Sequence, residues 1–145
     1  MRPKSIGSDP TVAVLADDLS GAAEVASAFV DRGAVSLLLG AGEAHEPGAV
    51  VVADLDTRSM SAAEAARTIR NALAGLPSGT LVVKKIDSLL RGNIAAEVGV
   101  LADGGPVVFA AGLPAVDRTV RGGVVHLGST PLHAAGVWSA ESTSP

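Results

Sequence analysis

The sequence contains no cysteine, and aromatic residues make up only 2% of its 145 positions. Without cysteine there can be no disulfide framework, no thiol nucleophile and no cysteine-type zinc site. A net charge of −4 and a pI near 5.2 argue against a nucleic-acid-binding protein, which normally carries a basic excess. No run approaches the roughly 18 apolar residues of a membrane span, and none is long enough for a signal-peptide core. We therefore expect a cytoplasmic protein without nucleic-acid or membrane partners.

The chain is instead rich in small aliphatic residues, and hydrophobic residues make up 48% of it. Short apolar runs of β type alternate with helical patterns along the chain. The strands are predicted at 12–16, 35–39, 49–53, 80–83 and 106–110, with a short one at 124–127, and the helices at 22–32, 61–76 and 94–102. This alternation predicts an α/β fold, with a mostly parallel, Rossmann-like sheet flanked by helices in a single domain over residues 1–145.

Charged residues gather directly after the predicted strands. Asp17 and Asp18 follow the first strand, Arg58 follows the third, and Arg118 comes soon after the fifth. The densest group is the turn 84–93 after the fourth strand, with the sequence Lys-Lys-Ile-Asp-Ser-Leu-Leu-Arg-Gly-Asn. In a parallel sheet these turns share the carboxyl edge, where open α/β folds bind their ligands.

Each of these residues also has a plainer interpretation. Asp18 or Ser20 could serve only as the cap of the helix that follows. Arg58 and Arg91 could form surface ion pairs. Of the neighbours Lys84 and Lys85, one is expected to point to solvent, because adjacent side chains on a strand face opposite ways.

The chemistry of the turn favours a hydroxy acid as ligand. Guanidinium groups offer a planar fork to a carboxylate or phosphate, and Asp, Ser and Asn side chains suit hydroxyl groups. The sequence has no Gly-x-x-x-x-Gly-Lys-Ser/Thr loop and no Gly-x-Gly-x-x-Gly after a strand, so no nucleotide site is identified. The three histidines show no metal-ligand spacing, and no metal site is predicted.

Five motifs, in this order, make the chain similar to the four-carbon acid sugar kinases, a family long catalogued as a domain of unknown function. They are Ala-Asp-Asp-Leu-Ser-Gly-Ala at 16–22, Asp-Thr-Arg-Ser at 56–59, the turn at 84–93, Leu-Pro-Ala at 113–115 with Arg118-Thr119, and Gly-Ser-Thr-Pro-Leu at 128–132. Members of that family phosphorylate threonate, erythronate or 3-oxo-tetronate with ATP. Two positions depart from the family pattern, which usually has Thr at Leu89 and Gly at Asp117.

The resemblance implies a small-molecule sugar acid as ligand and assigns residues to it. The substrate-binding residues it suggests, together with those favoured by their chemistry, are Asp17, Arg58, Lys84, Ser88, Arg91, Asn93 and Arg118. Asp18 and Asp87 are the candidates for the catalytic group near the attacking hydroxyl. The family uses ATP and Mg²⁺ through a C-terminal nucleotide-binding domain. We expect that domain to be absent here, which makes residues 1–145 an incomplete sugar-acid-binding domain that needs a separate nucleotide-binding subunit.

Two alternatives stay open at this point. The chain could be a binding module that senses a hydroxy acid without turning it over. It could also be a decayed gene fragment whose exposed sheet edge is not covered.

Overall fold

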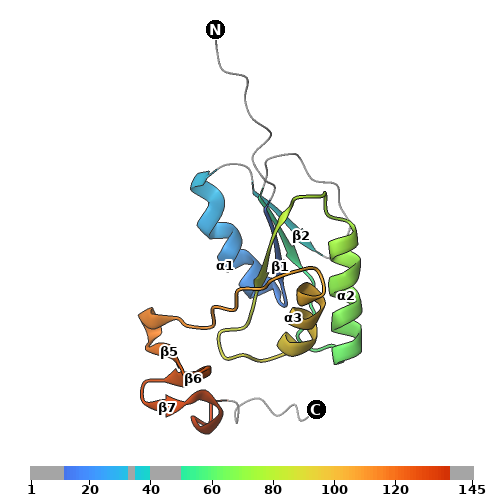
Figure 1. The fold of residues 1–145 in the computed structure, drawn as a ribbon. Helices are drawn as coiled ribbons and strands as arrows, with labels where there is room; N and C mark the ends of the chain where they lie inside the picture. Colours follow the sequence, from blue (N-terminus) through green and yellow to red (C-terminus); the bar gives the residue numbers. More distant parts are fainter. Residues whose placement is uncertain (1–11, 33–34, 40–49, 138–145) are drawn as a thin grey trace.

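A parallel four-stranded sheet forms the centre of the molecule in a computed structural model, which describes residues 12–32, 35–39 and 50–137 (Figure 1). The strands are β1 (Val12–Ala16), β2 (Val35–Leu39), β3 (Val50–Asp54) and β4 (Leu81–Lys85). They lie in the order β2-β3-β1-β4, and every neighbouring pair is parallel. The predicted α/β fold with a mostly parallel sheet is confirmed.

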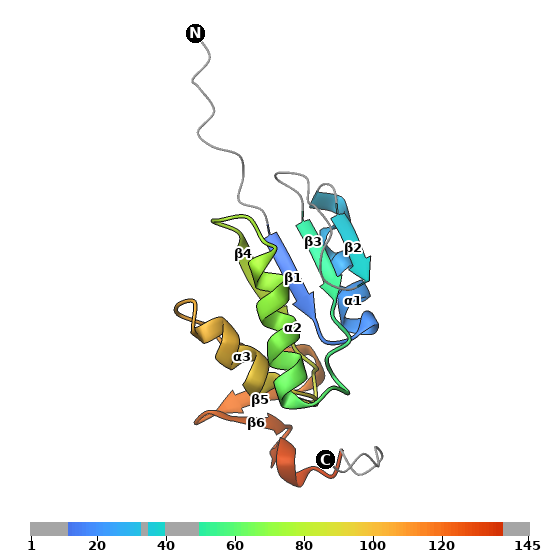
Figure 2. The same ribbon diagram turned by 90° about the vertical axis from the view of Figure 1, so that its right-hand side faces the viewer.

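Helices cover both faces of this sheet. Helix α1 (Leu19–Phe29), followed by a 3-10 turn at Val30–Arg32, lies on one face, while α2 (Ala62–Ala74) and α3 (Ile94–Ala102) lie on the other (Figures 1 and 2). The alternation along β1 sorts the core accordingly. Val14 packs with Ala22 of α1, whereas Leu15 packs with Ile69 of α2. The central strands β1 and β3 are thus buried on both sides, as continuous apolar strands require, whereas Leu81 of β4 is 57% exposed.

Capping side chains fix where the helices begin. At α2 the predicted capping box is present, since Ser61 Oγ accepts from the Glu64 backbone N–H and Glu64 Oε2 accepts from the Ser61 backbone N–H. The helix ends at Gly75. Helix α1 begins at Leu19, three residues before the predicted start, because the Asp18 side chain caps it.

The fifth strand predicted at 106–110 is wrong. This apolar run is extended but forms no ladder with any described strand, and Val108 is 93% exposed. An apolar run becomes a strand only where a neighbour accepts its backbone hydrogen bonds, and Pro106 has no N–H to donate. Among the described strands β4 therefore pairs only with β1, and its outer edge is open.

A small antiparallel sheet follows that run. It consists of β5 (Arg118–Arg121), β6 (Val124–Leu127), which confirms the short predicted strand, and β7 (Thr130–Pro131). Short 3-10 turns flank it at Pro114–Val116 and Leu132–Ala134. Gly122 and Gly123 connect β5 to β6 with φ values of 56° and 79°, which a two-residue hairpin turn of type I′ requires at both positions. This sheet supplies one wall of the pocket described below.

Candidate functional site

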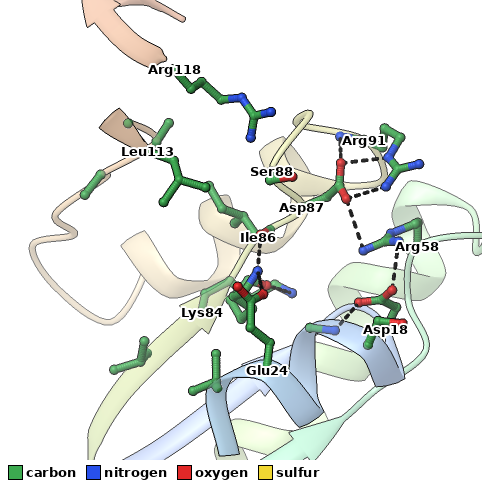
Figure 3. Close-up of a pocket in the computed structure, with 18 residues that line it drawn as sticks. Asp18, Glu24, Arg58, Lys84, Ile86, Asp87, Ser88, Arg91, Leu113 and Arg118 are labelled. Atoms are coloured by element: carbon green, nitrogen blue, oxygen red, sulfur yellow. Dashed lines mark hydrogen bonds and ion pairs between the residues drawn. The ribbon is translucent and has the colours of Figure 1, made fainter. Parts of the chain in front are cut away.

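A cavity of about 600 Å³ opens at the carboxyl edge of the parallel sheet. The strand register places the edge residues together, since Ala16 at the end of β1 pairs with both Asp54 of β3 and Lys85 of β4. Seven of the nine predicted site residues line the cavity. They are Asp18, Arg58, Lys84, Asp87, Ser88, Arg91 and Arg118 (Figure 3). The predicted convergence is present for the turns after β1, β3 and β4, whereas Arg118 comes from a strand of the small sheet and not from a turn after a fifth parallel strand.

Arg58 forms ion pairs with three carboxylates on one side of the pocket. Its Nε lies 2.9 Å from Asp17 Oδ2, its Nη1 2.9 Å from Asp18 Oδ2, and its Nη2 3.4 Å from Asp87 Oδ1. Partial burial alone would lower the pKa of Arg58, but the hydrogen bond to Asp17 and the three carboxylates raise it above its usual value. Arg58 is a permanent cation that joins the turns after β1, β3 and β4.

Asp87 is held by the turn that follows it. Its carboxylate accepts the backbone N–H groups of Leu89 and Arg91 and a bidentate fork from the Arg91 side chain, with both fork distances at 2.7 Å. Burial alone would raise the pKa of Asp87, but these hydrogen bonds and the Arg91 charge lower it from 3.8 to about 2. The turn closes through Gly92, whose φ of 81° brings its backbone against Arg58.

Asp18 has two roles at once. Its Oδ1 accepts the Gly21 N–H at 2.9 Å and caps α1, while its Oδ2 pairs with Arg58. The capping interpretation therefore holds for Asp18 and not for Ser20. A Cβ atom at Gly21 would stand 2.9 Å from Asp18 Oδ1 and 3.4 Å from Lys85 Cγ, so the close approach of α1 to the pocket needs glycine here.

Both lysines of the turn line the pocket, and the expectation that one points to solvent is wrong. Lys84 Nζ lies 3.2 Å from Glu97 Oε2, and the Lys84 side chain is only 5% exposed. Lys85 Nζ lies 3.0 Å from Glu24 Oε2 on α1. The two side chains leave the strand on opposite faces, as alternation requires, but a helix covers each face and supplies a carboxylate.

Arg118 stands apart from the other cations. It comes from β5 in the small sheet, is only 8% exposed, and points into the pocket (Figure 3). Its Nε and Nη1 have no hydrogen-bond partner, and no ion pair reaches it within the part of the chain that the structure describes. Buried cationic donors without partners are costly, so this guanidinium is suited to receive an anion.

Two predicted residues lie outside the lining. Asp17 is buried at 3% exposure beneath Arg58. Asn93 donates from its amide to the backbone carbonyls of Thr57 and Met60, at 2.9 and 2.8 Å. Both residues hold the loop that carries Arg58, Asp17 through the Arg58 side chain and Asn93 through the loop backbone.

Sequence reasoning missed the carboxylates that pair with the lysines, Glu24 and Glu97, as well as the buried Thr57. Glu97 is 1% exposed and accepts a short hydrogen bond from the Thr57 hydroxyl. One signal could have identified it, because Glu97 is the lone charged residue in the apolar helix Ile94–Ala102. Glu24 carries no comparable signal, since a glutamate on an amphipathic helix is ordinary.

The carboxylates of the pocket do not fit a metal site. Asp18, Asp87 and Glu24 are each paired with a lysine or arginine. No group of three potential metal-ligating side chains occurs among the described residues. A Mg²⁺ ion needs oxygen ligands that such cations do not occupy.

Among the helices that the structure describes, none has the length and apolar character of a membrane span.

Comparison with known proteins gives a consistent result. A family model described as a sugar-binding N-terminal domain matches residues 12–145. A D-threonate kinase from Cupriavidus necator is 37% identical over 135 residues, which cover 89% of this chain and 32% of that protein. A D-threonate kinase from Salmonella typhimurium is 34% identical, covering 82% of this chain and 30% of that protein. The chain thus spans about a third of the length of the curated relatives it matches.

Solved structures share the fold. A Bordetella bronchiseptica protein from a domain family of unknown function, a domain-swapped dimer with bound citrate, superposes with a TM-score of 0.79 at 28% identity. The match covers 94% of this chain and 38% of that one. A Haemophilus influenzae protein has a TM-score of 0.70 at 24% identity, covering 92% of this chain and 35% of that one.

Proposed function

Since this chain belongs to the family of sugar-binding N-terminal domains, we propose that its pocket binds a four-carbon sugar acid of the threonate, erythronate or 3-oxo-tetronate type. In this proposal the chain is the substrate-binding portion of an ATP-dependent kinase. The relatives named D-threonate kinase support the substrate class. The observation that carries the proposal is the buried Arg118 side chain, which lines the pocket and whose Nε and Nη1 have no hydrogen-bond partner among the described residues.

Arg118 is the proposed anchor for the ligand carboxylate. A carboxylate can accept in parallel from Nη2 together with Nε or Nη1, the two nitrogens that have no partner among the described residues. The other four cations of the lining already have carboxylate partners. These carboxylates balance the charges of the four cations, which leaves Arg118 as the cation of the lining without a described carboxylate partner. A ligand held there extends across the pocket toward Ser88 and Asp18, whose oxygens suit hydroxyl groups.

Of the two catalytic candidates, Asp18 and Asp87, we propose that Asp18 acts on the substrate and that Asp87 is a positioning residue. The pKa of Asp87 near 2 makes it a poor proton acceptor at neutral pH, because its negative charge is already stabilised by Arg91 and backbone N–H groups. Asp18 has one oxygen on the helix cap and one on Arg58. We assign Asp18 the closer role, orienting the hydroxyl that attacks, and Asp87 the role of holding Arg58 and Arg91 in place.

The proposed reaction transfers the terminal phosphoryl group of ATP to that hydroxyl and releases ADP and a proton. No group of three potential metal ligands occurs among the described residues, and we propose that ATP and Mg²⁺ are held by a nucleotide-binding portion outside them, on a separate subunit or a longer chain. We therefore propose that residues 12–137 alone bind the sugar acid without turning it over.

Isothermal titration calorimetry with D-threonate, L-threonate, D-erythronate and the neutral polyol threitol tests this function. We expect saturable binding of at least one acid and none of threitol, because the polyol lacks the carboxylate. An assay for ADP in the presence of ATP and Mg²⁺ is expected to show no turnover by this chain alone. Equal affinity for acid and polyol would contradict the proposal.

A second candidate is a binding module for hydroxy acids that has no kinase role. The citrate in the similar Bordetella bronchiseptica protein favours it, since citrate is a hydroxy acid with more than one carboxylate. Citrate belongs in the same titration. Tighter binding of citrate than of any four-carbon acid would favour this candidate over the kinase portion.

A further inference from the structure

A buried group of three polar residues includes one residue of the pocket lining, Lys84, and two residues outside the lining, Thr57 and Glu97, to which the proposed function gives no role. Thr57 follows β3 and is fully buried, the Lys84 side chain in β4 is 5% exposed, and Glu97 on α3 is 1% exposed. One carboxylate oxygen of Glu97 accepts from the Thr57 hydroxyl, and the other lies 3.2 Å from Lys84 Nζ. We call these three residues the Glu97 group.

We propose that Glu97 is a positioning residue for the pocket, which holds the Lys84 ammonium at the pocket wall and fixes the loop that presents Arg58. The expected effect of Glu97 on sugar-acid affinity rests on the proposed function. Glu97 itself lies outside the pocket lining, so it would act only through Lys84 and Thr57.

The chemistry of the group explains why a carboxylate is needed. Lys84 can only donate hydrogen bonds, and the Thr57 hydroxyl donates to Glu97 in this arrangement. A carboxylate offers an acceptor oxygen to each of them, whereas an amide has a single acceptor oxygen. Lys84 Nζ also donates to the Lys85 carbonyl at 3.1 Å, so two acceptors fix the ammonium from different sides.

Burial of Glu97 points the same way. A buried charge costs several kcal/mol unless it is paired, and a packed apolar side chain often gives a more stable protein than a buried ion pair. The rest of Ile94–Ala102 is apolar, so the helix could pack there without a charge. A positioning role gives this buried glutamate a use that an apolar side chain could not have.

Thr57 of the Glu97 group is joined to α3 at Glu97 and at Asn93, the residue that precedes the helix. Thr57 immediately precedes Arg58, its hydroxyl bonds to Glu97, and its carbonyl accepts the Asn93 amide at 2.9 Å. Arg58 in turn spans Asp17, Asp18 and Asp87. Loss of Glu97 would release the Thr57 hydroxyl, which is one of the contacts that hold this loop, together with the Lys84 ammonium.

The test compares Glu97→Gln with Asp103→Asn, which removes an exposed carboxylate at the end of the same helix. The first measurement is the rate of reductive methylation of Lys84 relative to Lys85, followed by mass spectrometry. We expect Glu97→Gln to raise that ratio roughly fivefold, because a pairing worth about 1 kcal/mol is lost. Asp103→Asn should leave it unchanged, and an unchanged ratio in both variants would overturn the inference.

The second measurement is the affinity for D-threonate. Glu97→Gln should weaken it roughly tenfold, and the effect should shrink in a Lys84→Met background, because the two residues act on one path. Tighter binding, or an unchanged affinity with a lower melting temperature, would show that Glu97 merely neutralises Lys84 or supports the fold. If Glu97→Gln does not fold, Glu97→Asp keeps the charge but is too short to reach both donors, and the same changes are expected.

The two proposals can fail separately. Faster labelling of Lys84 in a chain whose wild type binds no sugar acid would leave the tether standing and refute the proposed function. Binding of D-threonate by the wild type, with unchanged Lys84 labelling and unchanged affinity in Glu97→Gln, would leave the proposed function standing and refute the positioning role.

Discussion

Two arginines of one pocket differ in almost every respect except residue type. Arg58 has three carboxylates within 3.4 Å, whereas no described carboxylate pairs with Arg118. Arg58 comes from the parallel sheet and joins its loops, while Arg118 comes from the small antiparallel sheet and faces them. The difference shows that charged side chains of one pocket can have different roles. Ion-paired residues such as Arg58 stabilise the pocket, whereas an unpaired residue such as Arg118 can bind an anionic ligand. The same substitution at both positions should therefore have opposite effects.

Arg58→Met should give the largest loss of stability. Asp17 is buried, its Oδ1 has no hydrogen-bond partner among the described residues, and its Oδ2 pairs with Arg58. Removing Arg58 leaves that carboxylate uncompensated, and we expect a loss of about 3 kcal/mol in the free energy of unfolding. Urea denaturation followed by circular dichroism measures it. A loss below about 1 kcal/mol, the size typical of an exposed ion pair, would remove the distinction between the two arginines.

Arg118→Met should leave stability intact and weaken binding. Removing a buried cation without a partner costs the fold little, so the melting temperature should stay level or rise. Affinity for D-threonate should fall roughly 10- to 100-fold, because a hydrogen-bonded charge contact is worth about 1.5–3 kcal/mol. Arg121→Met on the same strand is the control, since Arg121 is exposed. A destabilised Arg118→Met variant with unchanged affinity would reverse our assignment.

Acid should weaken the paired side of the pocket through Asp87. Its folded pKa near 2 lies below the ordinary 3.8, so its contribution is complete above about pH 4 and is lost as pH falls through 2. The size of the shift corresponds to about 2 kcal/mol. Urea denaturation between pH 2 and 5, with Asp87→Asn as the reference, measures the difference. A difference between the two proteins that does not change with pH would contradict the low pKa.

Gly92→Ala should have the smallest effect of these. Its φ of 81° is unfavourable for alanine, and the new Cβ would stand 3.3 Å from Arg58 Cγ. We expect a loss of about 1–2 kcal/mol. Gly79→Ala is the matched control, because Gly79 has a φ of 84° but nothing within 4 Å of the added atom. The excess loss at position 92 measures the packing of the turn on Arg58, and equal losses would show that this contact is unimportant.

The parallel sheet and its pocket edge could be predicted because their signals are local. Continuous apolar runs mark β1 and β3, the Ser61–Glu64 spacing marks α2, and polar residues directly after strands mark the edge. The 106–110 run gave the same signal and failed, since a strand also needs a partner in space. The apolar pattern of a segment does not show whether another strand lies beside it to pair with.

The pairing of charges could not be predicted for the same reason. Lys84 and Glu97 lie thirteen positions apart, and Arg58 is more than forty from Asp17, so only the folded chain shows which cations are satisfied. The sequence indicated a group of positive charges at the sheet edge. It did not indicate that Arg118, contributed by a separate small sheet, would be the one described cation of the pocket left without a partner.

The Nε–H signal of Arg118 in a ¹⁵N-correlated NMR spectrum tests the central claim most directly. During titration with D-threonate, we predict that this signal shifts and saturates, while that of Arg121 on the same strand stays in place. Arg118→Met identifies the signal by its loss. A saturating titration in which other pocket signals move and the Arg118 signal does not would contradict the assignment of Arg118 as the carboxylate anchor.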